Sequence, residues 1–374
     1  MLILTGVCQP VKSRQIALFR RSLSVILLKN LLESGPVKAA AACRIDCGGT
    51  LDIKTFYYPL RHLSPCTFNI ALNMKTRVRL LPYSSGEIKV SSRGFRTEVH
   101  PADSAPFSGP LGLVFAITTY FRVDGVHIEI VSESPPRSAL GGSSTAAVAL
   151  IGALAKALAG EGIPPMSTKQ IVLLAHAIEE AVAGIPCGLQ DQLAAAYGGV
   201  HAWYWPSEPT EPPFKRTEVL TGDDYDTLEA HLLVAYCGAP HESQDINSKW
   251  IDQFVKGEAR PLWYEIVSST TEFVQSMTMK DWSGAVRAMN KEVEIRRKMT
   301  PEVFDKLGVA LLEKALAHGC GARFTGSGGG GCIWALGEEE NIRTLKPEWV
   351  DILSSREGAK LLDVRVDPSG LEVA

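Results

Sequence analysis

The order of apolar and polar positions divides the chain into a first part rich in strand patterns and a second part rich in helix patterns. Two-residue alternation and strand-forming residues dominate residues 41–131. The clearest predicted strands are 43–46, 66–72, 76–80, 87–90 and 126–131. Longer segments with a 3.6-residue period follow, so helices are predicted over 144–159 and 168–183, the second with a capping box at Ser167 and Gln170.

The proline-rich segment 206–213 predicts a loop and a boundary between two halves. Beyond it, an apolar run predicts a buried strand over 231–236. The remaining patterns predict helices over 250–279, 282–298 and 301–318, and strands over 332–336 and 362–366. This order is typical of an α+β fold in which helices pack on mainly antiparallel sheets.

The amino-acid composition argues against several classes of protein. The chain has 374 residues, enough for two domains, and its 45% hydrophobic and 21% charged residues are ordinary for a soluble globular protein. A net charge of −3 without a dominant basic stripe argues against a nucleic-acid partner. The eight cysteines form no CxxC pair and no cluster with histidine, so we predict neither zinc nor disulfides and expect a reducing cytoplasm. No apolar run reaches the roughly 18 residues of a membrane span, so no membrane partner is expected.

Residues 1–40 differ in composition from the rest. They carry six basic side chains against one acidic residue, Glu33, and their apolar run 23–28 is too short to span a bilayer. An acid-poor, arginine-rich start is typical of a transit peptide, whereas a non-catalytic appendage or an over-extended gene start explains it equally well. We predict an N-terminal extension that adds nothing to catalysis.

A segment rich in glycine and serine, 135–147, follows the predicted strand 126–131 and leads into the helix 144–159. Such a turn brings free backbone N–H groups and the positive end of the helix dipole to one place. This is an anion site, and polyphosphate is its usual occupant. No lysine follows the glycines, so the segment is not a GxxxxGK[ST] loop. The alternative is an ordinary turn whose serine caps the helix.

Two further segments, 184–192 (GIPCGLQDQ) and 321–332 (GARFTGSGGGGC), complete a set of ordered motifs. Together with the loop and an arginine-containing strand, they resemble the GHMP kinase superfamily, which includes galactokinase, homoserine kinase, mevalonate kinase and phosphomevalonate kinase. In the family's second motif, P-x3-G-L-G-S-S-A-A, Leu140, Gly141 and Ser143 match, while Ala139 and Gly142 replace a glycine and a serine. The resemblance spans about residues 41–374.

This resemblance implies a two-domain α+β fold with the active site between the halves. It divides the chain into an N-terminal ATP-binding domain, 41–210, and a C-terminal domain, 211–374. It also implies ATP and Mg²⁺ as cofactors. Phosphoryl transfer needs a phosphate cradle, a divalent ion and a group that orients the acceptor hydroxyl. The residues implied for the cradle are Pro136, Ser138, Leu140, Gly141, Gly142, Ser143 and Ser144.

Two residues are implied as magnesium ligands. Ser143 matches the family serine that contacts the ion, and a hydroxyl oxygen suits a hard cation; a helix cap is its alternative role. The second ligand is expected on the helix 168–183, where Glu179 and Glu180 compete. Glu179 flanks the apolar face of that helix and Glu180 points nearly opposite, so we predict Glu179 as the ligand and Glu180 as solvated. The apolar face consists of Ile171, Leu174, Ile178 and Val182.

Asp191 matches the aspartate that serves as catalytic base or acceptor orienter in much of the family. Its alternative role is the N-cap of a helix that begins at Gln192. Arg44 matches the basic residue of the first family motif, and it is expected to lower the pKa of Asp191 or to steady the transferred phosphoryl group. Both are predicted as catalytic residues.

The acceptor contacts follow from the resemblance as well. Asp52 fits the acidic residue that hydrogen-bonds sugar hydroxyls, and Thr50 lies in the same segment, 47–52, which is one residue shorter than the family forms. Gly328 and Gly329 belong to the third motif, whose bare backbone lets the loop approach both substrates. His241 is the fifth predicted contact.

The predicted activity is phosphorylation of a small-molecule sugar at its anomeric hydroxyl. Segment 191–199 resembles the heptose kinase branch, whereas 185–188 resembles galactokinase. We predict D-glycero-D-manno-heptose 7-phosphate as the acceptor, with a free hexose as the alternative. Leu189 and His241 stand where the heptose pattern has basic residues, and the cations that could compensate are Lys54, Arg61 and His62. Mevalonate or homoserine kinases, and a non-catalytic nucleotide or sugar sensor, are the alternatives.

Overall fold

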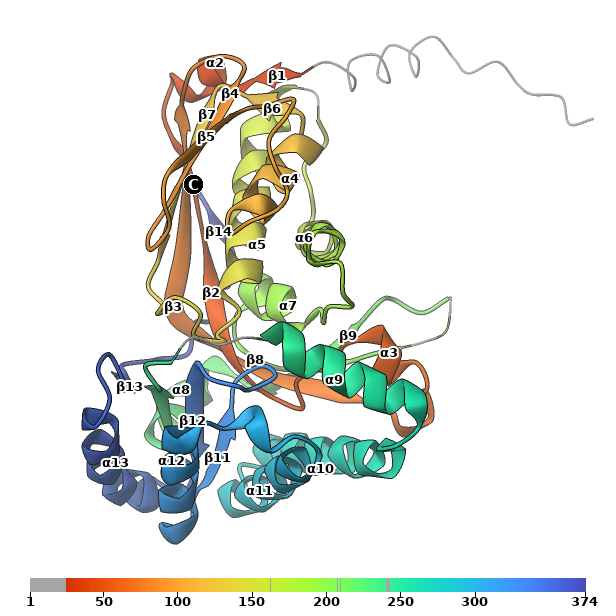
Figure 1. Cartoon of the computed structure of the whole chain (residues 1–374), viewed down its shortest axis with the longest axis vertical. Helices are drawn as coiled ribbons and strands as arrows, with labels where there is room; N and C mark the ends of the chain where they lie inside the picture. The colour runs from red at the N-terminus through yellow and green to blue at the C-terminus, as the bar shows by residue number, and fades with distance from the viewer. Residues whose placement is uncertain (1–24, 162, 207, 209, 240–242) are drawn as a thin grey trace, which may run out of the picture.

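The computed structural model describes residues 25–374 except 162, 207, 209 and 240–242. Figure 1 shows two halves stacked along the long axis, the upper built on one sheet and the lower on another, and the chain returns to the upper half at its C-terminus. Mixed helices and mainly antiparallel sheets confirm the predicted α+β class.

The larger sheet has eight strands, and its long hairpin partners β2 (Val37–Cys47) and β3 (Cys66–Pro82) form its centre. Within the described part of this sheet, β4 and β7 pair in parallel. The other strands are β4 (Glu87–Ser92), β5 (Glu98–Pro101), β7 (Val126–Ser132), β8 (Val200–Tyr204), β9 (Lys215–Leu220) and β14 (Glu372–Val373). Because β3 pairs with β7 along one half and with β8 along the other, it runs through both halves of the molecule.

Four helices cover one face of the upper part of this sheet (Figure 1). They are α4 (Gly112–Tyr120), α5 (Gly142–Leu158), α6 (Thr168–Ala183) and α7 (Gln190–Tyr197). Helix α5 is apolar on most sides and contacts β2, β3, α6 and α7, so it forms the centre of the upper core. Its first turn is thereby fixed at the lower end of that core.

The lower half contains a four-stranded sheet in the order β11, β12, β10, β13, flanked by helices. Its core also includes apolar side chains of β2 and β3, among them Ile45 and Phe68. The strands are β10 (Leu232–Tyr236), β11 (Gly321–Phe324), β12 (Cys332–Leu336) and β13 (Lys360–Leu362); the helices include α8 (Tyr225–Ala230), α9 (Ser243–Lys256), α10 (Arg260–Thr278), α11 (Trp282–Met299), α12 (Lys306–Ala317) and α13 (Glu339–Ser354). Since β2 and β3 contribute to both cores, the domain boundary at residue 210 stays a prediction.

Several predicted elements differ from the structure in their limits. The two strands predicted over 66–72 and 76–80 form one strand, β3, because the polar residues between them lie where β3 passes from one core to the other. The helix predicted over 250–279 is two helices, α9 and α10, separated by a turn at Gly257. The strand predicted to end at residue 366 stops at Leu362.

The described part of the predicted extension 1–40 packs against the rest of the chain, and its lack of a catalytic role stays a prediction. Residues 26–27 form β1, which pairs with β6 (Val123–Asp124), and Leu28 and Leu32 of helix α2 (Leu28–Leu32) are buried in the upper core. Strand β2 begins at Val37. The basic composition concealed these elements because Lys29 and Lys38 lie between the apolar side chains that pack inward. Residues 1–24 lie outside the described part of the chain.

A chain that starts at Ala40 is therefore expected to be unstable. It lacks the buried side chains of Leu28 and Leu32, each of which contributes about 1.5–3 kcal/mol, together with the first three residues of β2. Thermal unfolding should show a Tm at least about 5 °C below that of the full chain. A chain starting at Val25 serves as the control and should match the full chain; equal Tm values for all three would show that residues 26–39 do not support the core.

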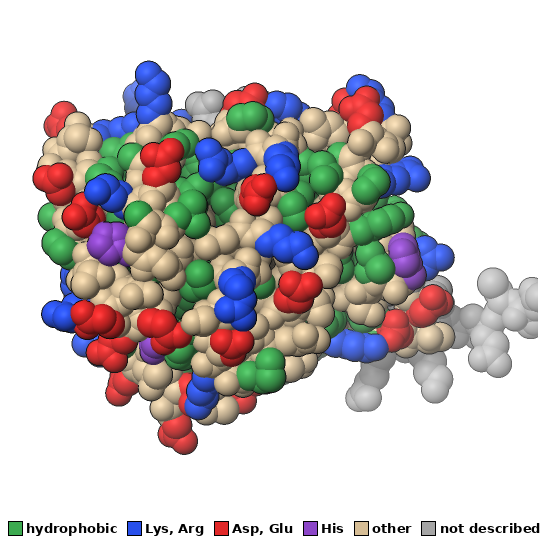
Figure 2. Space-filling model, turned by 90° about the horizontal axis from the view of Figure 1, so that it is seen from below, with side chains coloured by type: hydrophobic (Ala, Val, Ile, Leu, Met, Phe, Trp, Pro, Cys, Tyr) green, Lys and Arg blue, Asp and Glu red, His purple; other side chains and the backbone are tan. Residues whose placement is uncertain are grey.

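The surface of the lower half carries both signs of charge. In Figure 2, Lys and Arg side chains alternate with Asp and Glu side chains over the face seen from below. Among the described residues, no helix combines the length and apolar character that a bilayer crossing requires.

Candidate active site

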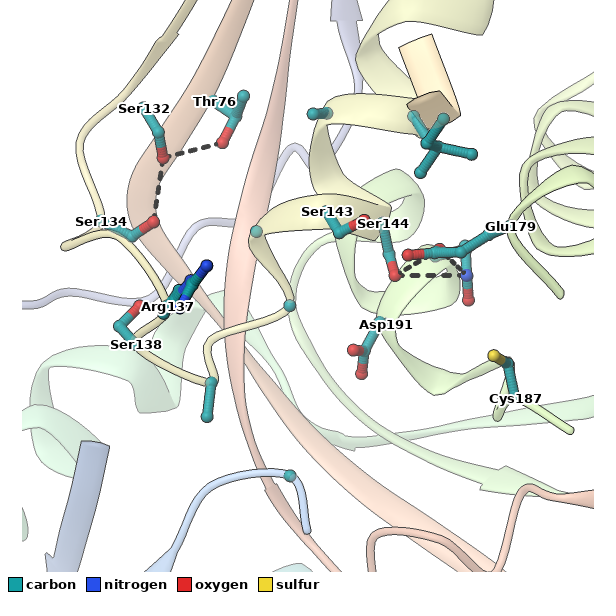
Figure 3. A pocket seen from close by; sticks show the side chains of 18 of the residues that line it. Thr76, Ser132, Ser134, Arg137, Ser138, Ser143, Ser144, Glu179, Cys187 and Asp191 are labelled. Carbon is teal, nitrogen blue, oxygen red and sulfur yellow. Dashed lines mark hydrogen bonds between the residues drawn. The ribbon is translucent and has the colours of Figure 1, made fainter. Parts of the chain in front are cut away.

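A cavity of about 480 Å³ lies between the two halves. It is lined by most of the segment 132–144, by Arg44 of β2 and Thr76 of β3, by α6 and the start of α7, and by residues of the lower half at Asn247, Gly326 and Ser327. Figure 3 shows its polar side chains, with the first turn of α5 at the centre. Both halves thus contribute to one cavity, as the motifs predicted.

The first turn of α5 faces this cavity without a side-chain cap. Gly141 is its N-cap, with a left-handed φ of 77°, and no side chain accepts a hydrogen bond at that position. The predicted alternative, in which Ser143 caps the helix, is therefore not the arrangement found. The uncapped N–H groups and the positive dipole end lie at the cavity, which is the electrostatic setting for a phosphate group.

The first and third motifs hold the backbone of this loop. The N–H of Arg44 donates to the Leu140 carbonyl (3.1 Å), and the N–H of Cys332 donates to the Ser138 carbonyl (2.9 Å). A Cβ at Gly331 would lie 2.6 Å from the Ser138 oxygen, so only glycine permits this approach. The Arg44 Nη1 also donates to the Ala139 carbonyl (2.6 Å). Two segments that are distant in the sequence therefore fix one loop.

Most residues predicted for the phosphate cradle line the cavity, and Leu140 is the exception. Pro136, Ser138 and residues 141–144 lie on its wall. The Leu140 side chain is fully buried in the lower core and anchors the loop there, so a nucleotide contact through its backbone stays a prediction.

The predicted substrate contacts of Gly328 and Gly329 also need correction. Neither lines the cavity: a Cβ at Gly328 would meet the Val303 carbonyl at 2.7 Å, and one at Gly329 would meet Ile246 at 2.7 Å. Gly326 and Ser327 of the same motif line the cavity instead. His241, the remaining predicted contact, lies outside the described residues.

Glu179 projects from α6 to the first turn of α5 (Figure 3). Its Oε2 accepts hydrogen bonds from Ser144 Oγ (2.7 Å) and from Gln192 Nε2 (2.7 Å). Burial raises the pKa of Glu179, while the hydroxyls of Ser144 and Ser143 lower it. The helical-face argument therefore selected the glutamate that reaches the cavity.

The oxygen atoms around Glu179 fit a magnesium ion. Ser143 is exposed on the cavity wall, and the Oε1 of Gln192 is buried with no hydrogen-bond partner. Among the described residues, no group of three or more His, Cys, Asp or Glu side chains could hold a metal. That is compatible with Mg²⁺, which commonly takes one or two carboxylates and completes its shell with water and substrate phosphates. Gln192 is a residue that the sequence reasoning missed.

Glu180 is only partly exposed to solvent, and it also has a partner within the protein. It is half-buried, and its Oε1 accepts a hydrogen bond from the backbone N–H of Cys187 (3.3 Å). It does not line the cavity. Its role is to hold the turn that follows α6.

Asp191 and Arg44 form an ion pair at the floor of the loop. The Nε (2.8 Å) and Nη2 (2.7 Å) of Arg44 both contact Asp191 Oδ1. Asp191 lies in the first turn of α7 but is not its N-cap, which is Leu189. Burial raises the pKa of Asp191, and the Arg44 guanidinium opposes that rise. The Asp191 side chain remains 24% exposed and lines the cavity, so a substrate can reach it.

Asp52 lies on the opposite wall with one carboxylate oxygen unpaired. Its Oδ2 accepts from the N–H of Gln190 (2.9 Å), whereas Oδ1 is buried without a partner. A side chain at Gly188 would collide with this carboxylate, which explains the glycine there. Burial, aided by repulsion from Asp191, raises the pKa of Asp52 to about 7.

Two further polar atoms on this wall were missed by the sequence reasoning. The Oγ of Ser327 and the Oδ1 of Asn247 are buried without hydrogen-bond partners, and both residues line the cavity. Thr50 lines it as well, with an unusual positive φ of 77°. Unpaired acceptors from three separate segments make this wall suited to a ligand with several hydroxyl groups.

The other end of the cavity carries a chain of hydroxyl groups and two arginines. Thr76 Oγ1 lies 3.0 Å from Ser132 Oγ, which lies 2.9 Å from Ser134 Oγ (Figure 3). Arg93 and Arg137 line the same cavity. These residues were not predicted, because single hydroxyl residues in strands carry no distinctive sequence signal.

The cations suggested for a sugar phosphate do not reach the cavity. Lys54, Arg61 and His62 are absent from its wall, and Leu189 is buried in the upper core. The cationic side chains among the described wall residues are Arg44, Arg93 and Arg137.

Two family models match this chain. Residues 112–199 match the GHMP kinases N terminal domain, and residues 281–353 match the GHMP kinases C terminal model. The chain belongs to the GHMP kinase superfamily. This GHMP kinase is accordingly a phosphotransferase that acts on an alcohol group, and ATP is the phosphate donor of its family.

Individual relatives differ in the substrates that their names state. Mevalonate kinase of Pyrococcus horikoshii is 25% identical over 296 residues, covering 73% of this chain and 83% of its own length. A D-glycero-D-manno-heptose 1-phosphate kinase from Bacteriodes thetaiotaomicron has a TM-score of 0.69 at 17% identity, covering 90% of this chain and 98% of its own. Lactococcus lactis galactokinase complexed with galactose has a TM-score of 0.71 at 14% identity, covering 96% and 100%. These structural likenesses establish the shared fold.

Proposed function

We propose that this protein is a sugar kinase that transfers the γ-phosphoryl group of ATP to a sugar hydroxyl, at the anomeric position. The observation that carries this proposal is that Asp52, Asn247 and Ser327 line the same cavity as Asp191, and that each has a buried side-chain oxygen without a hydrogen-bond partner. A sugar presents several hydroxyl donors to such a wall. An acceptor with one hydroxyl would leave buried acceptors unpaired, at a cost of about 1–3 kcal/mol each.

The roles that we propose for the other residues follow from their places around the cavity. Residues 136–144 hold the nucleotide phosphates through backbone N–H groups at the start of α5. Ser143 and Glu179 hold Mg²⁺, which neutralises charge on the phosphates when bound. Asp191 orients the acceptor hydroxyl and accepts its proton, and Arg44 fixes the carboxylate through Oδ1.

The charge of the acceptor wall favours an uncharged sugar. The predicted heptose 7-phosphate carries a distal phosphate, which requires a cationic partner. Arg44 is already engaged by Asp191, Asp46 and the Ala139 carbonyl, and Lys54, Arg61 and His62 lie off the wall. Arg93 and Arg137 line the other end of the cavity, beside the hydroxyl chain of Thr76, Ser132 and Ser134. We therefore place a free hexose before heptose 7-phosphate, and both before mevalonate, whose carboxylate needs a cation as well.

A substrate panel tests the proposal. ADP release and the phosphorylated product are measured with ATP, Mg²⁺ and, in turn, galactose, mannose, fucose, D-glycero-D-manno-heptose 7-phosphate and mevalonate. A free hexose is expected to give the highest kcat/KM, with phosphate on C1. A tenfold preference for the heptose phosphate would overturn the charge argument. Turnover of mevalonate alone would overturn the sugar assignment, and no turnover with any of them would favour a non-catalytic sensor.

The two glutamates of α6 give a matched test of the magnesium ligand. Glu179→Gln should raise the Mg²⁺ concentration needed for half-maximal activity by about tenfold and lower kcat, because the carboxylate charge is lost. Glu180→Gln retains an oxygen that can accept from Cys187 N–H, so its Mg²⁺ dependence should stay within about twofold of the original. Titration of activity with Mg²⁺ measures both, and the opposite ranking would exclude Glu179 as the ligand.

The raised pKa of Asp52 predicts a pH dependence for acceptor use. A carboxylate accepts hydroxyl hydrogen bonds best when ionised, and the pKa of about 7 means that the ionised fraction falls as pH drops through 7. The kcat/KM for the acceptor should therefore fall by about tenfold per unit below that pKa and level off above it. In Asp52→Asn the kcat/KM for the acceptor should be low and should show no inflection near pH 7. If the inflection near pH 7 persisted in Asp52→Asn, the pH dependence would belong to another titratable group.

A further inference from the structure

A buried chain of charges runs from Asp191 to the opposite wall of the cavity. Its members alternate in sign along the chain, and they come from β2, β11, α7 and α11. They are Asp191, Arg44, Asp46, Arg323, Glu292 and Arg296. The last four are fully buried, so each charge depends on its neighbours rather than on water.

The contacts along this chain are short. Arg44 Nη1 lies 3.4 Å from Asp46 Oδ1, and Arg323 Nη1 lies 2.9 Å from Asp46 Oδ2. Arg323 Nε contacts Glu292 Oε2 at 3.0 Å, and Arg296 Nε contacts Glu292 Oε1 at 3.0 Å. These pairings satisfy Glu292 from two sides and leave the outer nitrogens of Arg296 for other partners.

Those outer nitrogens hold the turn that precedes Asp52. Arg296 Nη1 donates to Thr50 Oγ1 (3.0 Å), and Nη2 donates to the Gly49 carbonyl (2.7 Å). The guanidinium lies over the rings of Trp250 (4.5 Å) and Trp263 (4.8 Å), which fix its plane. Thr50 has a left-handed φ of 77°, a conformation that a β-branched residue adopts only under external constraint.

We propose that Arg296 is a positioning residue for acceptor binding. It holds the turn at Gly49 and Thr50 in the conformation that directs Asp52 into the cavity. This inference rests on the proposed function, because Asp52 is there the acceptor ligand. A buried pair that served the fold alone could be replaced by apolar packing without loss of stability. The two directed bonds to the turn are what only an arginine fork provides.

The variant Arg296→Lys tests this role. Lysine keeps the charge beside Glu292 but lacks the planar fork that directs separate N–H groups to Glu292, Thr50 and Gly49. We expect the KM for the best acceptor of the panel above to rise about tenfold, with the KM for ATP within about twofold and kcat little changed. Thr50→Val removes the same Oγ1 bond from the other side while keeping the shape of the side chain, and it should raise the acceptor KM in the same direction.

Met289→Ala is the control for a loss of stability alone. Met289 is fully buried on the same helix, α11, and its side chain carries no charge. It should lower Tm without changing the acceptor KM. If Arg296→Lys and Thr50→Val also leave the acceptor KM unchanged, the positioning role is excluded.

Hydrogen–deuterium exchange separates this inference from the sugar assignment, because it needs no acceptor. Backbone amides in 48–53 should exchange at least about tenfold faster in Arg296→Lys than in the original protein, and no faster in Met289→Ala. Faster exchange in a protein that phosphorylates no sugar would leave the positioning role intact and overturn the proposed function. Unchanged exchange in 48–53 would overturn the positioning role itself.

Discussion

Asp191→Asn is expected to lower kcat by about 100-fold or more while the KM for ATP changes little. The asparagine side chain is nearly the same shape. Its amide oxygen can still accept hydrogen bonds from Arg44 Nε and Nη2, which lie 2.8 and 2.7 Å from Asp191 Oδ1. What the variant loses is the negative charge that orients the acceptor hydroxyl and takes its proton. Steady-state kinetics with ATP and the acceptor varied in turn measures both parameters.

Asp367→Asn is a matched control for this change. Asp367 is also a largely buried aspartate in an ion pair, with Lys75 at 2.9 Å, but it does not line the cavity. Its kcat should stay within about twofold of the original value. A kcat for Asp191→Asn near that of the control would remove Asp191 from the catalytic step.

Glu292→Gln is expected to reduce the free energy of unfolding by about 3–5 kcal/mol, the largest effect on stability that we predict for a single side chain. Glu292 is fully buried between Arg296 and Arg323, and both hold its pKa below the usual range against the effect of burial. The neutral amide leaves one positive charge uncompensated in the core. Urea denaturation followed by tryptophan fluorescence measures the change.

The double variant Glu292→Met with Arg296→Met tests whether the net charge is the cause. It removes one negative and one positive side chain, so Arg323 keeps its pairing with Asp46 and the core carries no unbalanced charge. Its loss of stability should be smaller than that of Glu292→Gln. A larger loss would mean that the geometry of the hydrogen bonds, rather than charge balance, holds this region together.

Sequence patterns correctly predicted the elements that are stabilised by contacts within one continuous segment. The helix predicted over 168–183 has those limits in the structure, because a capping box at Ser167 and Gln170 fixes its start and Gly184 with positive φ ends it. The same 3.6-residue period distinguished Glu179 from Glu180. The phosphate loop was recognised for a similar reason, since a strand, a glycine turn and a helix are contiguous in the sequence.

Pairings between distant residues could not be predicted in this way. Arg44 and Asp191 are 147 positions apart, so only the packing of α7 against β2 brings them together. Arg296 reaches Thr50 across 246 positions, and the packing of α11 against β11 places it. The burial of Leu28 and Leu32 is equally non-local, because it depends on the upper core built by later segments.

By itself, the sequence determined the α+β class, the family motifs and the face of α6 that carries a carboxylate to the cavity, because these depend on periodicity and on contiguous residues. Only the tertiary structure decided that Gly328 and Gly329 lie away from the cavity while Asn247 and Ser327 line it. The physical reason is that exposure to a cavity is a property of several segments folded together. A motif specifies its own backbone conformation, and the neighbours that cover it are supplied by the rest of the chain.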